Sequence, residues 1–522
     1  MLNRQLELLV PALPVCNLMG PADQTITLIT NDLAQVEPGA LFIAYQGMAF
    51  DGHQNIELAV ERGAVAIVAE RDLEFALPPS VTLLRVPNSR EAWAYLMSAW
   101  YDHPSRKLTL IGITGTDGKT STTNLIYAIV KAAGLRTGMI STVNAVIGDQ
   151  QLDTGFHVTT PDAPDVQRYL AQMVEAGAKI CLLETTSHGL AYHRVTGCDY
   201  DLAVVTNITH EHLNHHNNSL EEYRLAKARL FEMAGQAAIL NTDDWSYNFL
   251  SERIAGRIPI ISYGLAPEAA VRAEAIDLRP DATAFDVTLN GQRYSVESPL
   301  VGAFNVSNIL AALATTVIGL KIDPAVAIEG LRQFKGVPGR MERIDMGQEF
   351  TAIVDFAHTP NALKVALEAG RTMSDGQVIS VFGSAGLRDK EKRRMMAETS
   401  AELADLTVLT AEDPRTESLE EILEDMAAGA RSRGGIEGKT FWRVPDRGEA
   451  IRFALRLANP GDIVLSCGKG HEQSMCFGER EHLWDDRTAM RAALSEYLEI
   501  DGPEMPYLPT QNMEEKEWLN LK

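Results

Sequence analysis

The chain contains few cysteines and no long apolar run. Its five cysteines are scattered over 522 residues and form no Cys-x-x-Cys pair, which excludes a disulfide scaffold and a zinc ribbon. The sequence has no run of about 18 apolar residues, and its N-terminus lacks a basic stretch followed by an apolar core. We therefore expect a cytoplasmic protein that does not associate with a membrane.

Basic residues are also scarce relative to acidic ones. The chain has 47 Lys and Arg residues against 70 Asp and Glu residues, a formal net charge of −23. Because an acidic surface repels phosphate backbones at long range, we expect no nucleic-acid partner. The hydrophobic fraction of 45% can supply several packed cores, and the length predicts roughly three to four domains.

Strand and helix patterns alternate along the whole chain. Short β-rich runs such as 40–45 alternate with helical patterns up to about residue 100, where the Pro-containing segment 101–106 follows. Gly and Pro interrupt the pattern again at 335–340. Continuous apolar strands separated by helices predict parallel sheets in an α/β protein. We predict a small α/β N-terminal domain at 1–106, a central domain with a mostly parallel sheet at 107–338, a Rossmann-like C-terminal domain at 339–498 and a C-terminal extension at 499–522.

A glycine-rich turn joins a predicted strand to a predicted helix. The apolar run 108–114 leads into Gly115-Thr116-Asp117-Gly118-Lys119-Thr120-Ser121, and a helical pattern follows. Backbone N–H groups and the positive helix end of such a turn bind phosphate oxygens. Lys119 would reach the outer phosphates of a nucleotide, and the Thr120 hydroxyl would bind Mg²⁺. Ile113 stands where the general P-loop has Gly, so an ordinary strand-to-helix turn is the alternative to a P-loop-type ATPase domain.

Three further features follow this loop in the sequence, and the first two suggest a metal centre. Glu184 ends the next predicted strand, and a carboxylate beside a phosphate loop is a natural second ligand for Mg²⁺. The segment 210–216 contains four histidines, which indicate either a zinc site or a solvated polar loop. Tyr223 and Lys227 share one face of a predicted helix, although a lone helical lysine is usually a solvated charge.

These motifs resemble those of the Mur ligases, ATP-dependent amide-forming enzymes of bacterial cell-wall synthesis. The loop is similar to the family's Gly-Thr-Asn-Gly-Lys-Thr, with Asp117 in place of Asn. Later segments resemble the UDP-N-acetylmuramoyl-tripeptide synthetase (MurE) type, over about residues 23–495. The resemblance implies that ATP phosphorylates the carboxylate of UDP-N-acetylmuramoyl-L-alanyl-D-glutamate, and that a diamino acid attacks the acyl phosphate. ADP, phosphate and a peptidoglycan precursor would be the products.

The resemblance also implies roles for individual residues. Lys119, Glu184, His212 and Lys227 are expected to be catalytic, and Thr120, Glu184, His212 and Lys227 to hold Mg²⁺. In the family the lysine at the position of Lys227 is carbamylated by CO₂ to N6-carboxylysine. The expected ATP contacts are Gly115, Thr116, Asp117, Gly118, Lys119, Thr120, Ser121, Asn305, Arg340, Asp355 and His358.

The amino-acid substrate is expected at strand ends of the C-terminal domain. The resemblance places its contacts at Arg388, Asp413, Arg415, Gly468 and Glu472. Arginines suit a carboxylate and Glu472 suits an ammonium group. Asp413 stands where diaminopimelate-adding enzymes have Asn, and an ionised Asp accepts but does not donate hydrogen bonds. We therefore expect lysine or ornithine rather than meso-diaminopimelate.

Recognition of the UDP-linked acceptor is the feature that departs most from the family. The family's Asp-Ser-Arg, which helps to hold the uridine, falls on Asp32-Leu33-Ala34. A Mur-like ligase for another carboxylate acceptor is therefore one alternative, and a non-catalytic nucleotide-binding regulatory protein is another. We expect a monomer that binds only its small-molecule substrates. The expected contacts to the UDP-linked acceptor are Thr159, Thr160, Thr186, Ser187 and Arg194.

Overall fold

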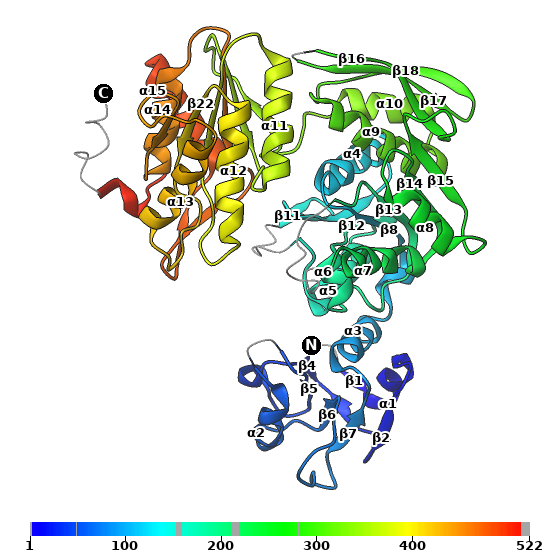
Figure 1. Ribbon diagram of the computed structural model, residues 1–522. Coiled ribbons are helices and arrows are strands. Elements are labelled where there is room, and N and C mark those ends of the chain that lie inside the picture. Colours follow the sequence, from blue (N-terminus) through cyan, green and yellow to red (C-terminus); the bar gives the residue numbers. More distant parts are fainter. Residues whose placement is uncertain (1–2, 48–49, 153–158, 210–218, 280, 513–522) are drawn as a thin grey trace. The chain divides into compact units, whose positions relative to one another are not determined.

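The computed structural model of the chain describes residues 3–47, 50–152, 159–209, 219–279 and 281–512. The chain forms two compact units, residues 1–272 with 310–330, and residues 273–309 with 331–522. Helices and mostly parallel strands alternate in both units, which confirms the predicted α/β class (Figure 1). Among the described residues, no helix is both long and apolar enough to cross a membrane.

The first unit begins with a five-stranded sheet in the order β2-β7-β6-β5-β4. Its strands β4 to β7 are parallel, and β2 is antiparallel to β7. Every residue of β5 and β6 is buried, because alternate side chains pack into cores on opposite faces of the sheet. The elements are β1 (Arg4–Gln5), α1 (Leu6–Leu9), β2 (Asn17–Met19), β3 (Thr25–Ile26), β4 (Leu28–Thr30), β5 (Ala40–Ala44), α2 (Ile56–Glu61), β6 (Ala66–Ala69), β7 (Thr82–Arg85) and α3 (Ser89–Trp100).

The same unit contains a second, larger sheet with the order β11-β10-β9-β12-β8-β13-β14-β15. Strands from β9 to β15 in this order are parallel, so their carboxyl ends meet at one edge. The strands are β8 (Thr109–Thr114), β9 (Thr137–Ile140), β10 (Ala145–Ile147), β11 (Gln150–Leu152), β12 (Ile180–Glu184), β13 (Tyr200–Val205), β14 (Ala234–Asn241) and β15 (Ile260–Gly264). The helices are α4 (Lys119–Ala132), α5 (Ala163–Glu175), α6 (Ser187–Ala191), α7 (Leu220–Met233) and α8 (Ser246–Ile254).

Register within this sheet brings the predicted site residues to one edge. Glu184 pairs with Ile113, and Val205 pairs with Thr114, so β8, β12 and β13 end level with one another. The glycine-rich loop after β8 therefore lies beside Glu184 and the segment after β13. Helix α4 begins at Lys119 because Gly118 adopts a left-handed conformation, with φ of +79°.

The second unit is built on a six-stranded sheet in the order β19-β20-β24-β21-β22-β23. All neighbours are parallel except β19 and β20. Side chains of α11, α12 and α13 pack in one core, and those of α14 and α15 pack in another, so helices cover both faces (Figure 1). The strands are β19 (Glu342–Ile344), β20 (Thr351–Asp355), β21 (Val378–Phe382), β22 (Leu406–Leu409), β23 (Phe441–Arg443) and β24 (Ile463–Cys467).

Doubly wound sheets of this kind bind ligands beyond the carboxyl ends of their strands. The helices are α11 (Pro360–Met373), α12 (Lys390–Leu403), α13 (Leu419–Ser432), α14 (Arg447–Leu457) and α15 (Asp486–Leu498). Hairpins form from β17 (Thr283–Leu289) with β18 (Gln292–Ser298), and from β25 (Ser474–Phe477) with β26 (Arg480–Leu483). Strand β16 (Val271–Leu278), helix α9 (Ala303–Leu313) with its π-helical continuation (Ala314–Gly319), and helix α10 (Pro324–Arg332) complete the chain.

The described part of the C-terminal extension packs on the second unit. Leu508 is fully buried in the core that contains α14 and α15. The Thr510 hydroxyl donates to Asp446 Oδ2 at 2.6 Å, and Asp446 caps the N-terminus of α14. This part of the extension therefore contributes to the core of the unit.

Candidate active site

The glycine-rich loop is fixed by the segment that follows β13. The backbone N–H groups of Thr116 and Asp117 donate to the carbonyl and the side-chain oxygen of Asn207, both at 2.9 Å. Gly115 has a φ of +151°, and a Cβ there would lie 1.8 Å from Thr206 Oγ1, so only glycine fits. Lys119 Nζ donates to the carbonyl oxygens of Gly115 and Thr116, at 3.0 and 2.8 Å. The predicted loop is thus a rigid turn with its lysine beside it.

Oxygen ligands gather next to this loop. Thr120 Oγ1 donates to Glu184 Oε2 at 3.1 Å, and Glu184 is fully buried. Thr142 donates to the same carboxylate twice, from Oγ1 at 2.8 Å and from its backbone N–H at 3.3 Å. A hydroxyl and a carboxylate beside a phosphate-binding turn fit Mg²⁺, a hard cation that prefers oxygen. Thr142 was not among the predicted residues, although its place after β9, the strand next to β12, could have indicated it.

Helix α7 carries the predicted lysine to the loop. Lys227 is buried, and its Nζ donates to the carbonyl of Gly115 at 2.7 Å. Tyr223, one turn earlier, places its hydroxyl 2.9 Å from Thr116 Oγ1. The structure therefore confirms that these side chains share a face of the helix, and both reach the same turn.

His212 and the other histidines of 210–216 lie outside the described residues. Their predicted role in metal binding stays a prediction. Within the described ranges, no group of three or more His, Cys, Asp or Glu residues could hold a metal ion. The described oxygen atoms that fit Mg²⁺ are therefore those of Thr120 and Glu184.

The residues expected to contact the UDP-linked acceptor form one hydrogen-bond network around Glu184. Thr160 Oγ1 donates to the backbone carbonyl of Glu184 at 2.9 Å and lies 3.1 Å from Thr186 Oγ1. Thr159 Oγ1 lies 3.2 Å from Thr142 Oγ1. Arg194 donates to the carbonyl of Thr160 at 2.8 Å and pairs with Asp162, and Ser187 begins α6 beside Thr186. The residues expected to bind the acceptor thus lie together at the strand ends of this unit.

Two of the ATP contacts expected in the second unit line one cavity. Asn305 and Arg340 both face a cavity of about 490 Å³. Asp355 accepts backbone hydrogen bonds from Met341 at 2.7 Å and from Ala357 at 2.9 Å, and burial raises the pKa of its carboxyl group. His358 Nδ1 lies 3.0 Å from the carbonyl of Phe356.

Phe356 occupies the position where the family more often has Tyr. The guanidinium of Arg340 lies 4.3 Å from the centre of its ring, in a cation–π arrangement. The rings of His358 and His471 lie 4.5 and 4.8 Å from it. The aromatic ring therefore orients Arg340 without the hydroxyl of a tyrosine.

The amino-acid site of the second unit contains a buried ion network. Lys469 is completely buried, and its Nζ lies 3.0 and 3.1 Å from the two carboxylate oxygens of Asp413 and 2.6 Å from Glu472. Asp413 also accepts from the backbone N–H of Cys476 at 2.9 Å. The charge of Asp413 is therefore neutralised by Lys469. This contact reduces the repulsion that Asp413 would exert on a second carboxylate of the substrate, while Asp413 itself still has no hydrogen to donate to one.

Two arginines lie close to this network. Burial and the nearby charge of Arg415 lower the pKa of Arg388. Over the ranges that the structure describes, neither guanidinium donates a hydrogen bond to another residue. Two adjacent cations with unused donors favour the binding of carboxylates.

Glu412 is a further buried carboxyl group at this site. It is 6% exposed, and its Oε2 has no hydrogen-bond partner among the described residues. Gly468 approaches it closely, since a Cβ at Gly468 would lie 2.2 Å from Glu412 Oε2. Burial raises the pKa of Glu412 to about 7. The sequence analysis assigned Glu412 no role, because nothing in the local sequence shows its burial.

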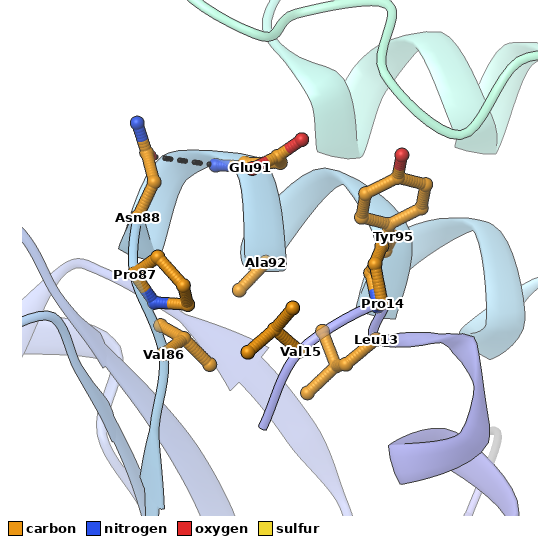
Figure 2. A pocket seen from close by; sticks show the side chains of 9 residues that line it. All are labelled: Leu13, Pro14, Val15, Val86, Pro87, Asn88, Glu91, Ala92 and Tyr95. Carbon is orange, nitrogen blue, oxygen red and sulfur yellow. Dashed lines mark hydrogen bonds between the residues drawn. The ribbon is translucent and has the colours of Figure 1, made fainter. Parts of the chain in front are cut away.

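A much smaller cavity of about 50 Å³ lies in the N-terminal part of the first unit. Figure 2 shows Val86, Ala92 and Tyr95 facing it, with the backbone N–H of Glu91 donating to Asn88. None of the residues expected to bind substrate line it. Its size excludes a nucleotide.

Comparisons with known proteins agree with these features. Three family descriptions match the chain: the Mur ligase family catalytic domain at residues 25–101, the Mur ligase middle domain at 113–316 and the Mur ligase glutamate ligase domain at 339–470. A UDP-N-acetylmuramyl-tripeptide synthetase of Roseiflexus sp. (strain RS-1) is 41% identical over 92% of this chain and 96% of its own.

A second relative from Geobacillus thermodenitrificans (strain NG80-2) is named UDP-N-acetylmuramoyl-L-alanyl-D-glutamate--2,6-diaminopimelate ligase. It is also 41% identical, over 94% of this chain and 99% of its own. A solved structure with the same enzyme name has a TM-score of 0.67 and 30% identity, and the match covers 94% of this chain and 98% of that one. The chain therefore belongs to the Mur ligase family, whose members are ATP-dependent amide ligases.

Proposed function

We propose that the chain adds a diamino acid to UDP-N-acetylmuramoyl-L-alanyl-D-glutamate in peptidoglycan precursor synthesis. The relatives named as a tripeptide synthetase and as a diaminopimelate ligase match over more than nine-tenths of this chain and of their own. The observation that carries the proposal is the grouping of Lys119, Lys227 and Glu184 around one phosphate loop. Lys119 and Lys227 share the carbonyl of Gly115, at 3.0 and 2.7 Å, and Thr120 joins Glu184 at 3.1 Å.

The first step is the transfer of the terminal phosphoryl group of ATP to the acceptor carboxylate. A free carboxylate is a poor acyl donor, and phosphorylation supplies a leaving group. Phosphoryl transfer depends on positioning and on neutralising charge. Lys119 and the N–H groups at the start of α4 would bind the phosphates, and Thr120 and Glu184 would hold Mg²⁺. When bound, Mg²⁺ neutralises charge on the phosphate oxygens.

The amino-acid substrate that we propose is meso-diaminopimelate. It carries two carboxylates, and the site offers Arg388 and Arg415 with unused donors. Lysine and ornithine carry only one carboxylate and would leave one arginine of the pair without a carboxylate. Asp413 does not oppose a second carboxylate because Lys469 takes up its charge. Glu472 would accept from an ammonium group.

An assay of ADP release tests the proposal. The purified chain is given ATP, Mg²⁺ and UDP-N-acetylmuramoyl-L-alanyl-D-glutamate, with meso-diaminopimelate, lysine or ornithine in parallel reactions. We expect ADP release that depends on the acceptor and is fastest with meso-diaminopimelate, and that stops when EDTA removes Mg²⁺. Faster release with lysine or ornithine would contradict the choice of amino acid. No release with any of the three would contradict the proposed reaction.

A ligase for a different carboxylate acceptor is the second candidate. Asp32, the retained residue of the family's uridine motif, uses its carboxylate to accept from the backbone N–H of Ala34 at 2.9 Å. The serine and arginine that follow in the family are Leu33 and Ala34 here. ADP release with acceptors that lack uridine, and none with the UDP-linked dipeptide, would favour this candidate. No release with any acceptor would favour a nucleotide-binding regulatory protein.

We further propose that CO₂ carbamylates Lys227, because a buried lysine that donates to the carbonyl of Gly115 places a cation at the phosphate loop, where Mg²⁺ is expected. Carbamylation replaces the cation with an oxygen ligand. We expect the activity of the chain to fall several-fold in CO₂-depleted buffer and to recover when bicarbonate is added. The variant Lys227→Met should show low activity that bicarbonate does not change. Wild-type activity that is independent of bicarbonate, together with an unmodified Lys227 by mass spectrometry, would contradict carbamylation.

A further inference from the structure

A fully buried ion pair joins the first residues of two helices in the second unit. Arg447 begins α14 and Asp486 begins α15, and neither side chain has any exposed surface. The guanidinium donates to both carboxylate oxygens, from Nε to Oδ1 at 2.7 Å and from Nη2 to Oδ2 at 2.6 Å. This bidentate contact fixes the plane of the guanidinium group.

The remaining donors of Arg447 reach two backbone carbonyls. Nη1 donates to the carbonyl of Ala411 at 3.1 Å, and Nη2 donates to the carbonyl of Cys467 at 2.8 Å. Ala411 directly precedes Glu412 and Asp413, and Cys467 directly precedes Gly468. One rigid group therefore binds the bases of both loops, 412–415 and 468–472, that carry the amino-acid site.

These two loops follow strands that are not neighbours in the sheet. Strand β21 lies between β22 and β24 and pairs with both, so no ladder of backbone hydrogen bonds joins the two strand ends directly. Arg447 spans this gap below the site. Nearer the substrate, the contact between Lys469 and Asp413 spans the same gap.

Both carboxylate oxygens of Asp486 accept hydrogen bonds from more than one donor. Besides Arg447, it accepts from Ser466 Oγ at 3.0 Å and from Trp484 Nε1 at 2.8 Å. Burial raises the pKa of this carboxyl group, but the charge and hydrogen bonds of Arg447 outweigh burial and lower the pKa below its usual range. The pair is therefore ionised at neutral pH, and the carboxylate holds the guanidinium in place.

Stability alone does not require such a pair. Apolar side chains of similar volume often replace a buried ion pair without loss of stability. They cannot donate to the carbonyls of Ala411 and Cys467, so they cannot set the distance between the two loops. Replacing both residues with apolar side chains therefore removes the two contacts of Arg447 to the loops without leaving a buried charge unpaired.

We propose that Arg447 and Asp486 are positioning residues for the amino-acid substrate, because they hold the loops 412–415 and 468–472 at the separation that the substrate requires. The inference rests on the proposed function. Arg447 contacts no substrate atom in this view and acts through Glu412, Asp413, Gly468 and Glu472.

The test compares steady-state constants of the wild type with those of two variants. Arg447→Met/Asp486→Leu removes both charges together, so neither is left buried and unpaired. We expect the KM for meso-diaminopimelate to rise about tenfold or more, because misplaced contacts weaken substrate binding. The KM values for ATP and for the UDP-linked acceptor should change less than about twofold. Arg447→Lys keeps the charge but loses the planar guanidinium group. Its KM for meso-diaminopimelate should lie between that of the wild type and that of the double variant.

The control is Arg452→Met. Arg452 makes a bidentate contact with Glu496 that joins the same two helices at the surface, at 2.5 and 2.7 Å. It touches neither loop, so all three KM values should stay at wild-type levels. A thermal unfolding curve for each variant shows that the measured protein is folded.

Four outcomes overturn the inference. A folded double variant with an unchanged KM for the amino acid would show that the pair does not position the site. An equal rise in all three KM values would show a general structural role. If the double variant does not fold, an unchanged amino-acid KM in Arg447→Lys would be decisive. A wild type that uses no diamino acid would reject the proposed function itself, and the inference with it.

Discussion

The variant Lys119→Met should lose at least about 10³-fold in kcat while remaining folded. Lys119 is the first residue of α4, and its Nζ donates to the loop carbonyls of Gly115 and Thr116. The side chain is part-buried, so water can replace it at both carbonyls. Removing the cation leaves the negative charge of the transferred phosphoryl group without its protein counter-charge, which raises the barrier to transfer.

The matched control for Lys119→Met is Lys131→Met, in the last turn of the same helix. Lys131 is exposed and lies about three turns beyond the phosphate loop, so its loss should change kcat less than about twofold. The measurement is acceptor-dependent ADP release, with circular dichroism to compare the folds. Near-normal kcat in Lys119→Met would show that the loop does not act on the transferred phosphate, and the proposed mechanism would then be wrong.

The fold and much of the site were predictable because strand ends are visible in the sequence. The apolar runs that end at Thr114 and at Glu184 are each followed at once by polar residues. In a parallel sheet these ends must meet at one edge. The structure confirms this for the phosphate loop and Glu184, and the helical spacing of Tyr223 and Lys227 correctly predicted that one face of α7 carries both.

What the sequence could not show are contacts between distant strand ends. From the local sequence Asp413 is interpreted as an unpaired anion, because its partner, Lys469, stands 56 residues later in the chain. Glu412 reads as an ordinary surface carboxylate because its burial depends on the packing of three strand ends. Arg447 and Asp486 begin separate helices 39 residues apart, and each alone reads as a solvated charge. Local patterns predict which elements form, but not the side-chain partners that the assembled sheet brings together.

The second large effect concerns stability and comes from Glu412. Its environment contains Lys392 of α12, Arg447 of α14, Lys469 after β24 and the neighbouring Asp413, yet burial outweighs the three cations and raises the pKa from 4.5 to about 7. The folded state therefore binds this proton more tightly than the unfolded state. The favourable contribution is fully present below about pH 4.5 and is lost as pH rises through about 7.

We therefore expect Glu412→Gln to be more stable than the wild type at pH 8, because the variant has no charge to bury. The rise from 4.5 to about 7 corresponds to a difference in the free energy of unfolding on the order of 3 kcal/mol at pH 8, which falls to zero below about pH 4.5. Urea unfolding curves at several pH values would measure it. A neutral residue that stabilises this position marks the carboxylate as one kept for function at the amino-acid site.

The control for this pH dependence is Glu504→Gln, in the exposed part of the C-terminal segment. Since Glu504 is solvated in both states, its substitution should change the free energy of unfolding by less than about 0.5 kcal/mol at every pH. The pH dependence of the stability difference between Glu412→Gln and the wild type decides between two interpretations. A difference that grows with pH means that the wild type buries a carboxylate without enough compensation. A difference that is constant with pH would mean that the carboxyl group is either paired or hydrated in the folded protein, and burial would then not control its titration.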